Sequence, residues 1–135
     1  MGSDQQSSEE YQMLTNHQQI VADEQGSPES DPDGKDAHEL GAKLDAGKNR
    51  LGLVLLGFAR ALQEIGRVGT YGASKYTDYG WIEVEDGERR YTDALLRHLF
   101  AEATGEWCDP DSGLSHAAHA AWNALARLDL MLRKI

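Results

Sequence analysis

The apolar residues of this chain gather beyond residue 50 and recur there at helical spacing. They are densest over residues 51–68, 89–104 and 112–134, where leucine and alanine return every three or four positions. This spacing places apolar side chains on one face of a helix. Gly69 and Gly105 follow the first two segments, where glycine favours the end of a helix. The sequence therefore predicts an all-α fold built on three helices.

The segment between the first two predicted helices has a different pattern. It reads Trp81-Ile82-Glu83-Val84-Glu85-Asp86-Gly87-Glu88-Arg89-Arg90-Tyr91, with apolar and polar residues alternating around Asp-Gly. That dipeptide favours the type I′ turn that joins two antiparallel strands. We expect a short β-hairpin near residues 81–91. Two strands alone are marginally stable, so the fold class remains all-α.

The first 36 residues differ in composition from the rest. They hold nine Asp or Glu and one Lys, a net charge of −8 out of −10 for the whole chain. A polar, charged segment buries too little apolar surface to offset its loss of conformational entropy. We therefore expect an acidic, mostly flexible tail over residues 1–36, with a short helix over 11–22. Residues 37–135 then form one folded domain.

Composition also limits the classes of function. No run approaches the 18 apolar residues that a membrane span needs, and the polar N-terminus does not resemble a signal peptide. Cys108 is the one cysteine, so no internal disulfide forms, as is typical of a cytoplasmic protein. The acidic balance does not favour nucleic acid as a partner. Beyond the tail the charge is close to neutral, so basic residues there could still face a polyphosphate.

Metal-binding residue types are densest over residues 97–123. His116, His119 and Asn123 follow the i, i+3, i+7 spacing that places side chains on one helix face. Imidazole nitrogens and carboxylate oxygens there could converge on one cation. The candidate metal ligands are Glu106, Asp109, Asp111, His98, His116 and His119. Two of them also have structural interpretations, Asp111 as a helix cap and His98 as a hydrogen-bonding support.

Three ordered motifs in this sequence carry a resemblance. They are Lys43-Leu44-Asp45-Ala46-Gly47-Lys48-Asn49-Arg50; Tyr71-Gly72-Ala73-Ser74-Lys75-Tyr76 with Trp81; and Arg97-His98-Leu99 with Gly105-Glu106, Asp109, Ser112-Gly113, His116, His119 and Asn123. Over residues 40–135 the chain resembles the phage dATP/dGTP diphosphohydrolase family, and it is similar to the phage MazZ enzymes. It departs from the family pattern at Gly80, where the pattern has Asn, and at Asp111, where it has Glu.

The resemblance implies a MazG-like helical bundle with nucleoside triphosphate pyrophosphohydrolase activity on a purine deoxynucleotide, dGTP foremost. It implies Mg²⁺ or Mn²⁺ as cofactor and, if the protein is encoded by a phage, the cytoplasm of the infected cell. A mixed nitrogen and oxygen shell suits Mn²⁺ better than Mg²⁺. The expected catalytic residues are Glu106, Asp109 and His116. The expected substrate-binding residues are Lys43, Asp45, Lys48, Arg50, Lys75, Tyr76, Trp81, Arg97 and Asn123.

Other interpretations of the sequence remain open. Broad leucine and alanine faces exceed what three helices can cover, so we expect a homodimer or homotetramer that completes the bundle. A metal-binding helical bundle without hydrolase activity is one alternative function. A small interaction protein, in which the acidic tail engages a partner and the histidines are structural, is the other. Release of pyrophosphate from a deoxynucleoside triphosphate would separate the enzyme from both alternatives.

Overall fold

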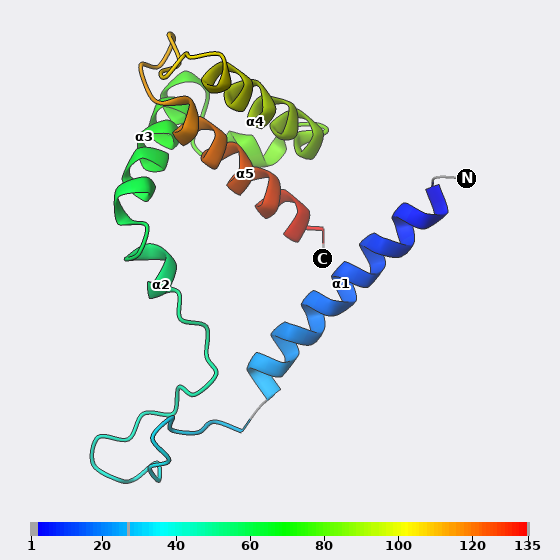
Figure 1. The fold of residues 1–135 in the computed structure, drawn as a ribbon. Helices are drawn as coiled ribbons and strands as arrows, with labels where there is room; N and C mark the ends of the chain where they lie inside the picture. The colour runs from blue at the N-terminus through cyan, green and yellow to red at the C-terminus, as the bar shows by residue number, and fades with distance from the viewer. Residues whose placement is uncertain (1–2, 27, 135) are drawn as a thin grey trace. The chain divides into compact units, whose positions relative to one another are not determined.

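The computed structural model describes residues 3–26 and 28–134 and divides the chain into two units, residues 1–51 and 52–135. The helices are α1 (Ser3–Gly26), α2 (Gly52–Leu55), α3 (Ala59–Lys75), the 3-10 helix η1 (Gly80–Glu83), α4 (Gly87–Ala103) and α5 (His116–Leu132) (Figure 1). Among the described residues there are helices and no strands, which confirms the predicted all-α class.

The first unit consists of α1 and an irregular segment that follows it. α1 is longer than the helix predicted over residues 11–22. In the irregular segment, the buried Asp31 accepts hydrogen bonds at Oδ1 from the N–H of Asp33 at 2.8 Å and at Oδ2 from the N–H of Lys43 at 2.6 Å. Lys48 pairs with Glu29 at 2.6 Å. These contacts join residues 29–31 to residues 43–48, so the boundary expected at residue 36 falls inside a hydrogen-bonded loop.

The first helix of the second unit differs from the helix predicted over residues 51–68. It breaks after α2, resumes at Ala59 and continues through Gly69 to Lys75. A Cβ built on Gly69 would lie 3.3 Å from the indole nitrogen of Trp122 in α5. Gly69 therefore serves as a close-packing position within α3, and the prediction that the helix ends there is wrong.

The predicted β-hairpin near residues 81–91 is also wrong. Residues 80–83 form η1, and Asp86 takes a left-handed conformation with φ 53° just before α4 begins at Gly87. Gly87 is buried, and a Cβ built on it would lie 2.7 Å from Leu130 Cδ1. The Asp-Gly pair thus starts a helix, because packing against α5 outweighs the local preference for a turn.

The second unit is organised around α5. Figure 1 shows α4 and α5 side by side, running in opposite directions, and α3 also packs on α5. The buried apolar side chains among the described residues are small or β-branched, namely Val68, Ala118, Ala120 and Ala126. Many larger apolar side chains are exposed in this single chain, including Phe100 at 70%. None of the described helices is long and apolar enough to span a membrane.

The loop between α4 and α5 has a defined geometry. Gly105, with φ +95°, ends α4: its N–H donates to Glu102 O at 3.0 Å, and the N–H of Glu106 donates to Ala101 O at 3.0 Å. This is the Schellman arrangement, which confirms Gly105 as the residue that stops the helix. Further along, the N–H of Asp109 donates to Leu114 O at 2.8 Å, and the N–H of His116 donates to Trp107 O at 3.0 Å. The loop therefore folds back on itself and brings Asp109 next to the start of α5.

Candidate metal and nucleotide site

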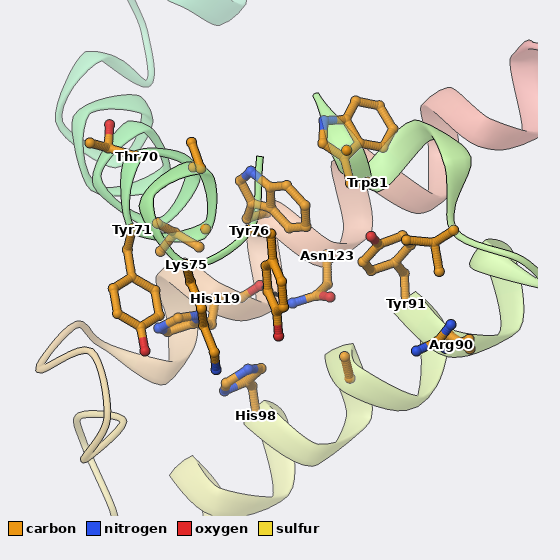
Figure 2. A pocket seen from close by; sticks show the side chains of 18 of the residues that line it. Thr70, Tyr71, Lys75, Tyr76, Trp81, Arg90, Tyr91, His98, His119 and Asn123 are labelled. Atoms are coloured by element: carbon orange, nitrogen blue, oxygen red, sulfur yellow. Dashed lines mark hydrogen bonds between the residues drawn. The ribbon is translucent and has the colours of Figure 1, made fainter. Parts of the chain in front are cut away.

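A cavity of about 1320 Å³ opens in the second unit. Its walls come from the end of α3, from η1, from one face of α4, from the loop after α4 and from α5. Figure 2 shows Lys75, Tyr76, His98, His119 and Asn123 converging on one part of it, with Trp81 and Tyr91 farther along. The cavity thus brings together the second and third motifs, which are separate in sequence.

Three histidine rings meet where α4 approaches the start of α5. The Nδ1 atoms of His98 and His116 lie 2.8 Å apart. The ring of His98 stacks on that of His119, with centroids 4.5 Å apart and planes 12° from parallel. His119 in turn contacts Ser112 Oγ through Nε2 at 2.7 Å. His98 is therefore held between two rings from the same turn of α5.

Glu106 determines the orientation and tautomer of His116. Its Oε1 lies 2.8 Å from His116 Nε2, and the His116 side chain is only 4% exposed. A carboxylate can only accept a hydrogen bond, so His116 carries a proton on Nε2. A neutral His116 therefore presents the lone pair of Nδ1 to His98, which is the arrangement of many metal-binding histidines.

Asp109 supplies a carboxylate beside these rings. Its Oδ1 accepts hydrogen bonds from the N–H groups of Asp111 and Ser112, both at 3.0 Å. Burial acts to raise the pKa of Asp109, but these two hydrogen bonds and the neighbouring His119 and His98 outweigh it, so the pKa is lowered. Asp109 is therefore ionised at neutral pH. The backbone bonds occupy one oxygen and fix the direction of the other.

Burial, and then the positive charges of the neighbouring histidines, lowers the pKa of His98. Burial is also the largest influence that lowers the pKa of His119, although the charge of Asp109 opposes it. Both rings are therefore neutral near pH 7. A neutral imidazole has a free lone pair, which is the form that binds a metal ion.

Within the described part of the chain, His98, Asp109 and His116 form a group that could hold a metal ion. One ligand atom from each lies within 4.8 Å of the others. Two nitrogens and one carboxylate oxygen are a donor set that divalent transition metals accept. The oriented His116 and the fixed Asp109 support this fit, because both donors are already held in place.

Basic and aromatic side chains line the rest of the cavity. Lys75 Nζ lies 5.9 Å from the ring centroid of Tyr71 and 5.5 Å from that of Tyr76. The phenol groups of Tyr71 and then Tyr76 hold the pKa of Lys75 above its usual value, so it is fully charged. Arg97 lines the same wall. Figure 2 shows the Lys75 ammonium directed toward His98.

The aromatic wall is built on Trp122. Its indole contacts Trp81 edge to face at 6.1 Å and Tyr91 at 5.7 Å. All three residues line the cavity and are only partly exposed. Asn123, next to Trp122, is buried and donates from Nδ2 to His119 O at 2.8 Å. Its amide therefore holds the backbone of the histidine-bearing turn.

The predicted site residues fall into three groups. Lys75, Tyr76, Trp81, Arg97, Asn123, His98, Asp109, Asp111 and His119 line the cavity. Glu106 and His116 lie beside it, joined to His98 through hydrogen bonds. Lys43, Asp45, Lys48 and Arg50 belong to the first unit, where Lys48 is paired with Glu29. The structure thus brings the second and third motifs together in one unit, whereas the first motif belongs to the other unit.

Sequence reasoning missed several residues of the cavity wall. Arg89, Arg90 and Tyr91 line it, yet they had no predicted site role, because they fall where the expected β-hairpin and the expected helix overlap. With a helical register, the basic pair directly before an aromatic residue would have been the available signal. Ser112 was part of the third motif, but its contact with His119 depends on the path of the loop and has no signature in sequence.

Comparison with known proteins adds independent information on this chain. The model of the family described as "dATP/dGTP diphosphohydrolase, N-terminal" matches residues 38–135. A protein of Salmonella phage PMBT28 named "dATP/dGTP diphosphohydrolase" is 36% identical over 83 residues, which cover 60% of this chain and 26% of that protein. The chain therefore spans about a quarter of the length of this relative. No solved structure matches it.

Proposed function

The chain belongs to the dATP/dGTP diphosphohydrolase N-terminal family, and from this premise we propose that it is a metal-dependent pyrophosphohydrolase. The proposed substrate is a purine deoxynucleoside triphosphate, dGTP foremost, and the products are the monophosphate and pyrophosphate. The name of the phage relative supports the reaction and the purine base. The preference for dGTP over dATP rests on the resemblance to the MazZ enzymes.

The observation that carries the proposal is the position of the His98–Asp109–His116 group at a cavity with a charged wall. Lys75 and Arg97 line this cavity together with His98 and Asp109. A triphosphate is densely anionic, so its binding needs fixed cations near the phosphate oxygens. Lys75 supplies a point charge and Arg97 a planar fork for two oxygens. A cavity of about 1320 Å³ is ample for a nucleotide.

The aromatic wall offers a place for the base. Trp81 and Tyr91 contact Trp122 edge to face, which leaves ring surface available along the cavity. A purine gains binding energy by stacking on such a surface. The phosphates would then extend toward Lys75 and the histidines, where Figure 2 places the opposite end of the cavity. In this orientation, the proposed reaction requires the α-phosphate to lie near Asp109.

The proposed reaction is hydrolysis at the α-phosphorus. A water oxygen forms a bond to the α-phosphorus, the bond from that phosphorus to the α–β bridging oxygen breaks, and pyrophosphate leaves. A divalent cation bound there would neutralise phosphate oxygens and lower the pKa of the attacking water. Asp111 lines the cavity, is exposed and does not belong to the His98–Asp109–His116 group. Its carboxylate would therefore accept the proton of the water.

A direct assay tests this function. Purified protein is incubated with each of the four deoxynucleoside triphosphates and with Mg²⁺ or Mn²⁺, and the products are separated by anion exchange. The proposal predicts purine monophosphate and pyrophosphate in equal amounts. Release of orthophosphate, or no turnover of any substrate with either metal, would contradict it.

A non-catalytic metal-binding bundle is the second candidate. The three donors all come from this chain's own side chains, so the group could bind a cation whether or not the protein hydrolyses a nucleotide. Metal binding combined with no turnover in the same assay would favour this candidate.

A further inference from the structure

We propose that His98 Nδ1, His116 Nδ1 and Asp109 are the protein ligands of one first-row transition-metal ion, such as Mn²⁺ or Zn²⁺, and that Glu106 positions His116 for it. This narrows the six residues predicted as ligands to three. The inference rests on the proposed function for the purpose of the ion. Its test measures binding without nucleotide, so the two can fail separately.

The two imidazole nitrogens already lie close to the spacing of two ligands on one metal ion. Two donors that each lie about 2.1 Å from one metal ion are about 3.0–3.4 Å apart. His98 Nδ1 and His116 Nδ1 are 2.8 Å apart, so a shift of a few tenths of an ångström gives the ligand spacing. Without an ion, a shared proton bridges the same two atoms. The pair is therefore already arranged around the position that a cation would take.

Glu106 independently supports the same site, because it fixes the tautomer of His116. The Schellman turn at Gly105 fixes the backbone of Glu106, whose Oε1 accepts the Nε2 proton of the buried His116. This proton position leaves Nδ1 of His116 as the donor toward His98. Glu106 lies outside the group of ligand atoms within 4.8 Å of one another. A carboxylate that orients a ligating histidine in this way is a common support of metal sites.

Neighbouring groups hold His98 and Asp109 in position. The ring of His119 stacks on His98, and Ser112 Oγ contacts Nε2 of His119. Asp109 is held by the N–H groups of Asp111 and Ser112 through Oδ1, so Oδ2 is the oxygen left for an ion. Since His98 and Asp109 line the cavity, the coordination positions that they leave open face it. A phosphate oxygen or a water could fill them.

The donor set selects the type of cation. Mg²⁺ prefers six oxygens in a strict octahedron and keeps much of its water, whereas imidazole nitrogen favours Mn²⁺, Zn²⁺ and their neighbours. Two nitrogens among three protein ligands therefore predict weak binding of Mg²⁺ and tighter binding of Zn²⁺ and Mn²⁺.

Titration calorimetry of the full chain with Zn²⁺, Mn²⁺ and Mg²⁺ tests the site. We expect one ion per chain and loss of that binding in His98→Gln and in Asp109→Asn. Glu106→Gln should retain the site with an affinity about 10–100-fold lower. His38→Gln, an exposed histidine of the first unit, and Glu102→Gln, an exposed carboxylate of α4, should bind as the natural chain does. Circular dichroism confirms the helix content of each variant.

The tautomer of His98 should change when the metal binds, whereas it would stay the same if the two histidines had only a structural role. Long-range proton–nitrogen NMR should show His116 protonated at Nε2 both with and without Zn²⁺. His98 should move its proton from Nδ1 to Nε2 when Zn²⁺ binds. Unchanged His98 nitrogen shifts at saturating Zn²⁺, or wild-type affinity in Asp109→Asn, would overturn the proposal.

Discussion

Gly87 at the start of α4 lies directly against Leu130 of α5, so close that a Cβ at Gly87 would come within 2.7 Å of Leu130 Cδ1. Gly87 is buried, although it belongs to the first turn of its helix. A side chain at this position would therefore force Leu130 to move. Because α4 carries His98 and α5 carries His116 and His119, this packing also supports the site.

Gly87→Ala should destabilise the protein by about 1–3 kcal/mol, because the new methyl group overpacks the contact with Leu130. Gly66→Ala is the matched control: Gly66 is exposed within α3, and a Cβ there meets nothing within 4 Å. The control should be neutral or stabilising by up to about 1 kcal/mol, since alanine favours a helix interior. Urea unfolding followed by circular dichroism measures both. A Gly87→Ala protein as stable as the control would contradict this account of the contact.

Local sequence patterns predicted the helices but not their exact extent. Leucine and alanine spacing located α4 closely, and Gly105 marked its end. The spacing also located the end of α5, but this helix begins at His116 with Ser115 as its N-cap, so the prediction of a start at residue 112 with Asp111 as a cap is wrong. The predictions of a helix end at Gly69 and of a hairpin turn at Gly87 were wrong. A glycine can mark a turn or a helix end, but it can also allow another helix to pack closely, as it does at both positions. The difference depends on Trp122 and Leu130, which lie far away in sequence. No local pattern contains that information.

The candidate site could be predicted in its residue types but not in its contacts. The spacing of His116 and His119 placed both on one face, and the two rings do meet His98. Their distinct surroundings, Glu106 beside His116 and Ser112 beside His119, follow from the fold of the loop. The loop conformation depends on positive φ angles at Gly105 and Gly113 and on backbone pairing, which sequence spacing does not encode.

Lys75→Met should raise KM for the nucleotide about tenfold or more, because it removes a charge from the phosphate end of the cavity while keeping the length of the side chain. Metal affinity measured without nucleotide should not change. Arg60→Met is the control, since Arg60 is exposed on α3 and does not line the cavity. Steady-state kinetics at saturating metal measures the effect. Equal KM values for both variants would show that Lys75 does not contact the substrate.

The protein should form a homodimer or homotetramer. Several large apolar side chains of α4 and α5 are 41–70% exposed in the single chain, among them Phe100 at 70% and Leu128 at 51%. Burying such side chains against a second copy is favourable by about 1.5–3 kcal/mol for each one fully covered. Light scattering should give a multiple of 14.9 kDa. Phe100→Glu should shift the mass downward and exposed Thr104→Glu should not, whereas a monomeric natural chain would refute the expectation.

The loop around Asp31 should lose its order in acid. The hydrogen bond from the N–H of Lys43, against the opposing effect of burial and helped by the N–H groups of Asp33 and Lys35, lowers the pKa of Asp31 below its ordinary 3.8. A carboxylate with a lowered pKa in the folded state stabilises above its unfolded pKa, and this contribution disappears as the pH falls through the folded value. The amide of Lys43 should therefore be protected from exchange near neutral pH and lose protection below pH 3.8. Asp31→Ala should remove the protection at every pH, and protection that persists in this variant would contradict the assignment.

Hydrolysis of dGTP in 18O-labelled water with Mn²⁺ tests the central claim most directly. Attack on the α-phosphorus places one labelled oxygen in the monophosphate and none in the pyrophosphate, as mass spectrometry of the separated products would show. The account predicts this labelling for the natural chain, with turnover absent in Asp109→Asn. Label in pyrophosphate or orthophosphate, or no hydrolysis by a chain that binds the metal, would contradict it.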